Sequence, residues 1–251
     1  MKNVVFIVSI KDSTKDASKR FNECAYDLCL KSWSMWCKKN NCELFVLEER
    51  IYPLEQMNPN WHKLFVFDLL EANNIDYDQI MIIDADTMIH PEAPNVFDTT
   101  EHKYCAVRNY GSMDWVCRSY EIYKTLYFPN ITYSPIDYFN SGVIILNKKH
   151  KVMYEKCKSF YLANYEEIIK TQKTFYLGTD QPMLNFFVRQ ENVDLKLLGY
   201  EWNMQDMNRF EVIGADMLYT RHGWIYHFNG GLRPHPRAWM EHTFKGLYEN
   251  K

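Results

Sequence analysis

The sequence contains no apolar run that approaches the ~20 residues needed for a membrane-spanning helix. Glycine and proline are scarce, with 9 of each in 251 residues, and no repeat, low-complexity tract or flexible linker divides the chain. The net charge is only −3, whereas a nucleic-acid-binding protein needs a clustered basic surface. We therefore expect one globular domain over residues 1–251, with neither a transmembrane segment nor nucleic acid as a partner.

Seven cysteines, an odd number, favour a reduced compartment over a disulfide framework. The first apolar stretch, residues 4–8, is too short for a secretory signal and is followed at once by charged residues, so we expect a cytoplasmic protein. Cys24, Cys29, Cys37 and Cys42 have a spacing that a zinc site also uses. Three of the four fall in an amphipathic helical pattern over 16–39, which favours small core residues over zinc ligands.

Apolar runs of strand length alternate with helical patterns along the chain. Short apolar strands separated by helices are typical of an α/β domain whose mostly parallel central sheet is buried on both faces by helices. The expected strands cover 4–9, 43–47, 79–83, 104–108, 141–146 and 195–198, and the expected helices cover 16–39, 61–73, 150–164, 180–189 and 239–247.

The segment 104–139 departs from this alternation, because it holds ten aromatic residues in 36 positions and shows poor periodicity. We interpret it as an aromatic-rich irregular insertion with a functional role, since long irregular segments in compact domains often carry function. The alternative is a secondary hydrophobic cluster beneath a loop.

Asp84 and Asp86 directly follow the most apolar run of the chain. Residues two apart in extended backbone point the same way, so both carboxylates would project from the carboxyl end of a central strand, where open α/β sheets bind ligands. Adjacent carboxylates repel one another unless a cation joins them, and oxygen ligands suit Mn²⁺ or Mg²⁺. Asp76 and Asp78 form the same pattern in a turn, where we expect solvated side chains.

Three further segments carry polar residues in settings that allow either a structural or a functional role. His227 follows an apolar pair and could complete the metal shell with nitrogen, while Gly230 and Arg233 follow in a loop suited to phosphate. Asn140 and Ser141 open a buried strand. Thr179 or Asp180 could simply cap a helix that has Pro182 in its first turn.

Taken together and in this order, the segments resemble retaining GT-A glycosyltransferases of glycosyltransferase family 8, the group that includes glycogenin and bacterial galactosyltransferases. The similarity lies in four motifs and a Trp202-Asn203 element between the last two of them. The motifs are the apolar strand ending in Asp84-Ala85-Asp86, Phe139-Asn-Ser-Gly-Val, Gly178-Thr-Asp180-Gln181-Pro-Met-Leu-Asn185 and His227-Phe-Asn-Gly230-Gly-Leu-Arg233-Pro234. The chain differs from the family pattern at Arg233, where lysine is usual, and at His235, where tryptophan is usual.

The resemblance implies a Rossmann-like GT-A domain and a role for each matching residue. Asp84, Asp86 and His227 would bind Mn²⁺, or Mg²⁺, and Asp180 and Gln181 would act at the sugar as the catalytic residues. The nucleotide-sugar donor would contact Ser9, Ile10, Asp12, Lys63, Asp84, Ala85, Asp86, Asn140, Ser141, Gly230 and Arg233.

The resemblance implies metal-dependent transfer of a hexose, with retention, from a nucleotide-diphosphate sugar, expected to be a UDP-sugar, to a hydroxyl of a glycan or a protein-linked sugar. The aromatic-rich insertion over 104–139 would lie on the acceptor side, and Trp115 and Tyr133 are the residues that we expect to contact the acceptor. A divalent ion and Arg233 would neutralise the diphosphate leaving group, and Gln181 is a poor nucleophile, which favours front-face substitution. Two alternatives stay open: an inverting GT-A enzyme or nucleotidyltransferase, with Asp114, Asp137 or Asp180 as base, and a non-catalytic glycan-binding protein.

Overall fold

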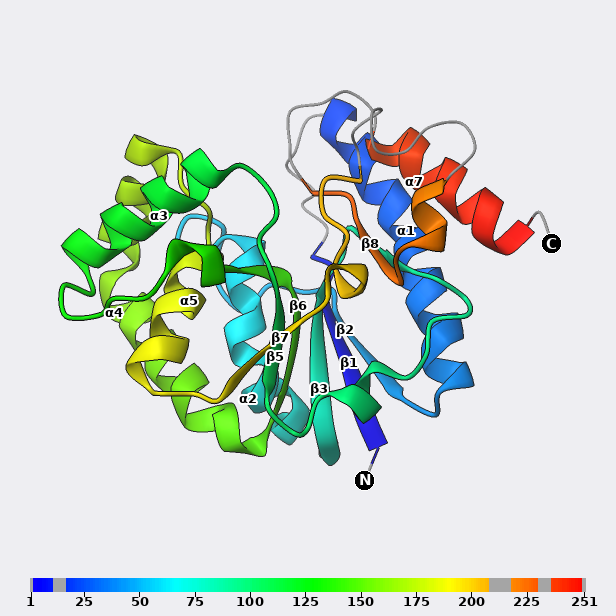
Figure 1. The fold of residues 1–251 in the computed structure, drawn as a ribbon, viewed down its shortest axis with the longest axis horizontal. Helices are drawn as coiled ribbons and strands as arrows, with labels where there is room; N and C mark the ends of the chain where they lie inside the picture. Colours follow the sequence, from blue (N-terminus) through cyan, green and yellow to red (C-terminus); the bar gives the residue numbers. More distant parts are fainter. Residues whose placement is uncertain (1, 11–16, 208–217, 230–235, 250–251) are drawn as a thin grey trace.

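A six-stranded sheet forms the centre of the computed structural model, which describes residues 2–10, 17–207, 218–229 and 236–249 (Figure 1). The strand order is β2-β1-β3-β6-β5-β7, and β6 alone runs against the other five. The predicted α/β class with a mostly parallel sheet is therefore confirmed. The strands are β1 (Lys2–Val8), β2 (Glu43–Leu47), β3 (Tyr77–Asp84), β5 (Tyr104–Arg108), β6 (Phe139–Asn147) and β7 (Leu195–Leu198).

Alternating side chains of each strand enter hydrophobic clusters on opposite faces of the sheet. In β1, Val4 and Phe6 belong to one cluster and Val5 and Ile7 to the other, and all four are fully buried. This burial on both faces explains why the strands read as continuous apolar runs.

Helices cover both faces of the sheet (Figure 1). On one side α1 (Ala17–Lys39) packs Trp33 and Trp36 against the sheet, and α7 (Pro236–Phe244) lies beside α1. The other side is covered by four helices of the middle of the chain. These are α2 (Val66–Ala72), α3 (Met113–Leu126), α4 (Lys151–Phe175) and α5 (Gln181–Gln190).

Two helices differ from the expected boundaries. The helix expected from residue 61 begins as a 3₁₀ helix, Pro59–Phe65, whose N-terminus is capped by the side chain of Asn58. Helix α4 continues to Phe175 and ends at Tyr176, which adopts the left-handed conformation with φ of 54°. Cys29 and Cys37 are buried core residues of α1, as their spacing predicted.

The interpretation of 104–139 as an irregular insertion is wrong, because this segment consists of β5, α3, a short 3₁₀ turn and the start of β6. Most of its rings pack inside the protein, which is the alternative interpretation of its aromatic content. Tyr133, for example, packs edge-on against Tyr120 and Phe186 with ring centroids 5.0 Å and 5.3 Å away. Tyr120 and Tyr123 lie on the buried face of α3, and Tyr120 stacks on Phe186 of α5, so these rings belong to the packing of a regular helix.

A second sheet of two short strands, β4 (Thr87–Ile89) and β8 (Ile225–His227), was not predicted. The two strands are antiparallel and pair Thr87 with His227. With three residues each, they are too short to produce a recognisable pattern. Their pairing brings β8, which is far from β4 in the sequence, to the carboxyl edge of the main sheet.

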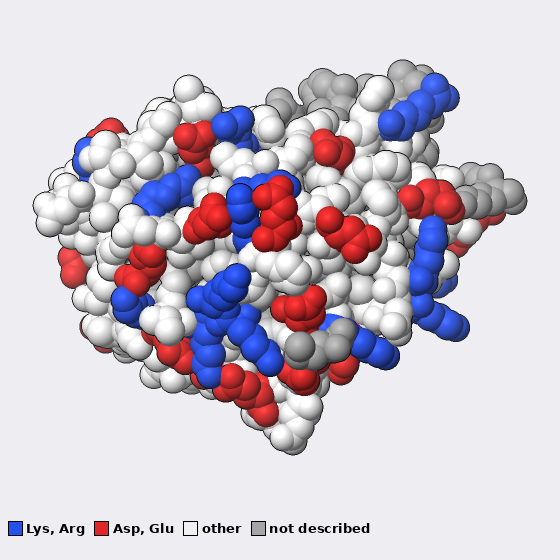
Figure 2. Space-filling model, turned by 60° about the horizontal axis from the view of Figure 1, so that its bottom comes forward, with Lys and Arg blue, Asp and Glu red and all other residues white. Residues whose placement is uncertain are grey.

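The opposite edge of the main sheet carries acidic and basic side chains side by side (Figure 2). They form exposed ion pairs such as Lys148 with Asp76 and Lys196 with Glu101. Exposed pairs of this kind contribute little stability but keep a surface free of one dominant charge. No helix among the described residues has the length and apolar character to cross a bilayer.

The first prediction concerns His150, which lies at this edge directly after β6. Burial lowers the pKa of His150 to about 4, and the backbone N–H of Asn147 donates to its Nδ1 atom. The unfolded chain takes up a proton near pH 6.5, before the folded protein does, so the free energy of unfolding should fall between about pH 6.5 and 4, by on the order of 3 kcal/mol. Urea unfolding at a series of pH values should reveal this slope, and the slope should be smaller in His150→Gln. Equal slopes for the two proteins would contradict the assignment.

Candidate active site

Asp84 is the last residue of β3 and Asp86 lies in the turn that follows, so both are at the carboxyl edge of the sheet, as predicted. The hydroxyl of Thr87 donates to the backbone oxygen of Asp84 at 2.7 Å, and the indole of Trp33 donates to the hydroxyl and backbone oxygens of Thr87. The backbone N–H of Phe228 donates to the backbone oxygen of Asp86 at 2.9 Å. The turn is thus fixed from both sides, and its two carboxylates lie in one place.

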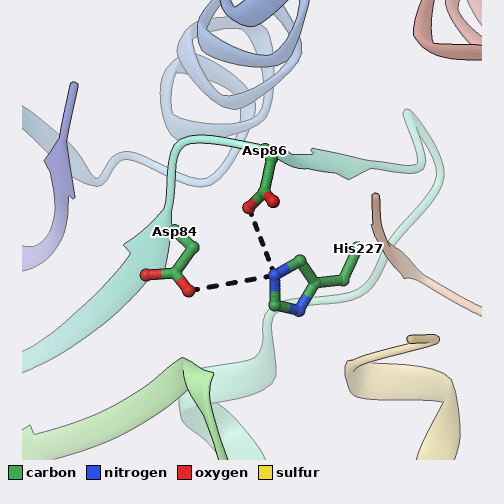
Figure 3. Close-up of side chains that lie close together, drawn as sticks. All are labelled: Asp84, Asp86 and His227. Carbon is green, nitrogen blue, oxygen red and sulfur yellow. Dashed lines mark ion pairs between the residues drawn. The ribbon is translucent and has the colours of Figure 1, made fainter. Parts of the chain in front are cut away.

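His227 completes a cluster with these carboxylates (Figure 3). Its Nε2 atom lies 3.2 Å from Oδ1 of Asp86 and 3.8 Å from Oδ2 of Asp84. One ligand atom from each residue falls within 4.8 Å of the other two. Carboxylate oxygens with one imidazole nitrogen are a donor set that suits Mn²⁺, so the residues present fit a divalent cation.

Gly142 in β6 makes room for the ring of His227. A Cβ atom at position 142 would lie 2.2 Å from Cε1 and 2.8 Å from Nδ1 of the imidazole. Real contacts are never that short, so every side chain other than glycine's hydrogen would displace the ring. The Asn-Ser-Gly sequence at the start of β6 therefore has a steric reason to contain glycine.

The electrostatics of the cluster favour positive charge between the carboxylates. Burial lowers the pKa of His227, but Asp86 and Asp84 raise it by more, so that it lies above its ordinary value. Burial likewise raises the pKa of Asp86, but His227, a backbone hydrogen bond and Lys63 together lower it by more. For Asp84 the effect of burial is the larger one and its pKa is raised. A cation at this point would stabilise both carboxylates in their charged form.

Lys63 is buried beneath the cluster, with 1% of its side chain exposed. Its Nζ atom lies 2.9 Å from Oδ1 of Asp84 and 2.8 Å from Oδ2 of Asp180, and it donates to the backbone oxygen of Ser141 at 3.1 Å. Burial lowers the pKa of Lys63, but the two carboxylates raise it by more. The ammonium group thus donates to Asp84 and Ser141 and forms an ion pair with Asp180, so all three of its partners belong to the protein.

Asp180 and Gln181 stand at the start of α5, beside Lys63. Asp180 occupies the N-cap position, but its side chain makes no capping hydrogen bond. Instead it pairs with Lys63 and accepts the hydroxyl of Thr179 at 2.9 Å. The capping role considered for Asp180 is therefore wrong. Gln181 is buried, and its Oε1 atom accepts from the backbone N–H of Ser141 at 3.2 Å.

Asn140 and Ser141 lie at the same edge, because β6 runs opposite to β3 and begins where β3 ends. Nδ2 of Asn140 donates to Oε1 of Gln181 at 3.1 Å. Two further amides adjoin these residues: Asn109, which accepts from Gln181, and Asn203, which donates to Asn140. No local pattern marked Asn109, and Asn203 was noted only within the Trp202-Asn203 element.

The remaining predicted donor contacts fall into two groups. Ser9 and Ile10 follow β1, whose last residue Val8 is paired with Asp84, so this loop begins beside the cluster. Ser9 is buried and its N–H donates to the backbone oxygen of Leu47 at 2.9 Å. The other group, Asp12, Gly230 and Arg233, lies outside the residues that the structure describes.

Comparisons by sequence identify no relative: no model of a protein family matches the chain, and no curated protein does. Several solved structures are similar in fold. A glycosyltransferase involved in glycosylation of the major capsid of PBCV-1 has a TM-score of 0.58 and 12% identity over 96% of this chain and 99% of that one. The galactosyltransferase LgtC, in complex with donor and acceptor sugar analogs, has a TM-score of 0.53 and 16% identity over 99% and 97%. GlyE of Streptococcus pneumoniae has a TM-score of 0.51 and 13% identity over 98% of this chain and 62% of that one.

At 12–16% sequence identity, the similarity to these solved structures establishes only the fold of this chain. The chain has the GT-A glycosyltransferase fold, and its resemblance to enzymes of the family 8 type is confirmed at that level. The site residues described above rest on the geometry of this chain.

The second prediction concerns the buried ion pairs of Lys63. Lys63→Met keeps the volume of the side chain but leaves Asp84 and Asp180 without a counter-charge, so we expect the free energy of unfolding to fall by about 3–5 kcal/mol. Denaturant unfolding measures the loss. The double variant Lys63→Met/Asp180→Asn should regain part of the lost stability because one carboxylate is then neutral.

A matched control is Lys148→Met, which removes the exposed pair with Asp76 and should cost less than about 1 kcal/mol. A loss for Lys63→Met no greater than that of Lys148→Met would show that the buried pairs do not stabilise the fold.

Proposed function

We propose that this protein is a metal-dependent glycosyltransferase that transfers a hexose from a UDP-sugar to a hydroxyl of a glycan or a protein-linked sugar, with retention of anomeric configuration. One observation carries the proposal: Asp84, Asp86 and His227 converge at the carboxyl edge of a GT-A sheet, beside Asp180 and Gln181. The fold of the solved glycosyltransferases supports the same conclusion.

The charge of the site supports a divalent cation as a participant. The site holds three carboxylates, of Asp84, Asp86 and Asp180, and one ammonium group, that of Lys63. Lys63 contacts Asp84 and Asp180, whereas Asp86 contacts His227. With a neutral imidazole at His227, two negative charges are uncompensated, which a divalent cation balances. When bound, Mn²⁺ or Mg²⁺ would neutralise charge on the diphosphate leaving group of the donor.

Within this proposal, Asp84, Asp86 and His227 hold the cation, and Asp180 and Gln181 border the sugar. Ser9, Ile10, Asp12 and Ala85 would contact the nucleotide. The start of β6, with Asn140 and Ser141, would form the floor beneath the sugar, and Gly230 and Arg233 would contact the diphosphate. Lys63 would act on the donor mainly through the two carboxylates that it orders.

The hydrogen bonds of the two proposed catalytic residues support a front-face substitution. Oε1 of Gln181 already accepts two hydrogen bonds, from Ser141 and Asn140, and therefore has no lone pair left to attack a sugar carbon. Asp180 is paired with Lys63 and accepts the hydroxyl of Thr179. The nucleophile in this proposal is therefore the acceptor hydroxyl and not a protein side chain. It enters beside the departing diphosphate.

The acceptor would approach near the end of β5, where a ring is accessible. Tyr110 is 51% exposed, directly follows Asn109, and lies edge-on to Tyr200 with ring centroids 5.5 Å apart. Aromatic faces of this kind stack on sugar rings. Tyr133, expected earlier as an acceptor contact, is held in the core, and Trp115 packs over Gly178 and Tyr138.

The alternative of an inverting enzyme requires a carboxylate that accepts a proton from the acceptor hydroxyl. Each of the three candidates faces a cation: Asp114 pairs with Arg118, Asp137 with Arg108, and Asp180 with Lys63. Each of these carboxylates therefore already has a cationic partner, which competes with an acceptor hydroxyl for its oxygens. The alternative of a non-catalytic binding protein leaves the convergence of three metal-ligand side chains without a use.

The third prediction is that UDP binds only together with a divalent cation. Calorimetric titration of UDP should give binding in the presence of Mn²⁺ and none in EDTA, because the diphosphate would otherwise meet uncompensated carboxylates. Asp86→Ala should weaken UDP binding by about 100-fold or more, since loss of a direct ligand exceeds the 10–100-fold effect of outer-shell changes.

Asp78→Ala is the matched control, because Asp78 belongs to the other Asp-x-Asp pattern and lies near the start of β3, at the far edge of the sheet. It should bind UDP and Mn²⁺ as the unaltered protein does. UDP binding that is indifferent to EDTA would contradict the metal-dependent site, and binding of GDP but not UDP would overturn the choice of nucleotide.

The fourth prediction concerns stereochemistry and needs no knowledge of the acceptor. When no other acceptor is supplied, we expect water to serve as a slow acceptor, so NMR can follow the first sugar released from an α-linked UDP-sugar before its anomers equilibrate. We expect the α anomer first. Initial release of the β anomer would establish inversion, and a glycosyl adduct on Asp180 or Gln181 detected by mass spectrometry would overturn the front-face route.

A further inference from the structure

Side-chain amides form a continuous hydrogen-bonded chain beneath the candidate site. Nδ1 of His227 lies 3.1 Å from Oδ1 of Asn203, and Nδ2 of Asn203 donates to Oδ1 of Asn140 at 2.9 Å. Nδ2 of Asn140 then donates to Oε1 of Gln181 at 3.1 Å, and Nε2 of Gln181 donates to Oδ1 of Asn109 at 3.2 Å. The chain thus connects a proposed metal ligand with a residue proposed to border the sugar.

Two backbone N–H groups determine which amide atoms in this chain accept hydrogen bonds and which donate them. The N–H of Gly142 points at Oδ1 of Asn140 at 2.9 Å, and the N–H of Ser141 points at Oε1 of Gln181 at 3.2 Å. A backbone N–H only donates, so the atoms that it meets must be the oxygens of these amides. The orientation of both side chains therefore follows from the backbone of β6.

The orientation of the Asn140 amide determines the orientation of Asn203 and, through it, which nitrogen of His227 carries a hydrogen. Oδ1 of Asn140 is an acceptor, so Asn203 must present its NH₂ group to it. Asn203 then presents its oxygen to His227, and Nδ1 of the imidazole must carry the hydrogen of that bond. Nε2 is left as the nitrogen that faces Asp84 and Asp86.

A register shift between β5 and β6 leaves the backbone N–H groups of Ser141 and Gly142 available to bond these side-chain amides. The register between β5 and β6 shifts between Ala106 and Val107: Ala106 is paired with Ile144, whereas Val107 is paired with Asn140. The pairing of β3 with β6 ends at Val143. Ser141 and Gly142 therefore lie outside both ladders, and a bulge of this kind re-aims strand residues next to a site.

Asn203 is itself held firmly. It is fully buried, and its segment runs alongside β8: the N–H of Met204 donates to the oxygen of Ile225, and the N–H of His227 donates to the oxygen of Met204, both at 2.8 Å. The ring of His227 is thus confined by Gly142 on one side and by Asn203 at Nδ1.

We propose that Asn203 is a positioning residue that keeps Nδ1 of His227 as a hydrogen-bond donor and so commits Nε2 to the cation. It takes its own orientation from the backbone of β6 through Asn140. This inference rests on the proposed role of His227 as a metal ligand. A metal-bound histidine generally donates its other N–H to a fixed acceptor, and loss of that acceptor costs 10–100-fold in metal affinity.

The fifth prediction has a spectroscopic part and a binding part. In ¹⁵N-labelled protein without metal or nucleotide, Nδ1 of His227 should carry a hydrogen that exchanges slowly with water, at neutral pH and above. His227→Gln assigns the signal. The signal should disappear in Asn203→Leu and persist in Asn203→Asp, which retains an acceptor for Nδ1. A bare Nδ1 in the unaltered protein would overturn the proposal.

The binding part measures Mn²⁺ by the paramagnetic resonance signal of the free ion. Asn203→Leu should lower the affinity for Mn²⁺ about 10–100-fold, and Asn203→Asp should retain it. The matched control is Asn147→Leu, which removes another buried amide from the far end of β6, where it donates to the backbone oxygen of His102. Asn147→Leu should lose stability without losing Mn²⁺ affinity.

An equal loss of Mn²⁺ affinity in Asn203→Leu and Asn147→Leu would mean that Asn203 acts only through stability, which overturns the positioning role. The Nδ1 signal is recorded without nucleotide or metal, so failure of UDP to bind would contradict the proposed function and leave this signal to decide the inference by itself.

Discussion

A buried ammonium group joins three segments that are far apart in the sequence. Nζ of Lys63 contacts Asp84 at the end of β3, Asp180 before α5 and the backbone oxygen of Ser141 in β6. An unpaired buried charge costs several kcal/mol, so the folded state requires all three acceptors to converge on one point. The carboxyl edge of the sheet is therefore ordered by the same contact that gathers the acidic groups of the site.

Two polar networks meet in neighbouring residues at the start of α5. Asp180 belongs to the ionic network of Lys63, and Gln181 belongs to the amide chain that ends at His227. Asp84 links the networks from the other side, with one oxygen toward Lys63 and the other toward His227. A site connected in this closed way keeps its groups at fixed separations, which is what electrostatic stabilisation of a transition state demands.

Sequence patterns predict the parts of this arrangement that are dictated locally. Strands buried on both faces read as apolar runs, so the six strands of the main sheet and the position of Asp84 and Asp86 after β3 could be predicted. Helix α3 was missed although its buried residues Val116, Ser119, Tyr120 and Tyr123 recur at helical spacing, because the many aromatic residues around them obscured that pattern. Asn109 and Asn203 have partners far away in the chain, and an isolated asparagine gives no signal of such a partner. The resemblance predicted Lys63 as a contact of the donor, and its three partners within the protein become visible only in the fold.

The excess of negative charge also bears on the order in which ligands would assemble. A nucleotide diphosphate is negative, and it would enter a site that holds three carboxylates and one buried ammonium group. Because like charges at short range repel strongly in a partly buried site, the diphosphate gains affinity only after a cation has neutralised the local negative charge. Under the proposed function the cation therefore binds before the donor or together with it. The geometry of Nε2 in His227, fixed through Asn203, is then a condition for binding the donor as well as the metal.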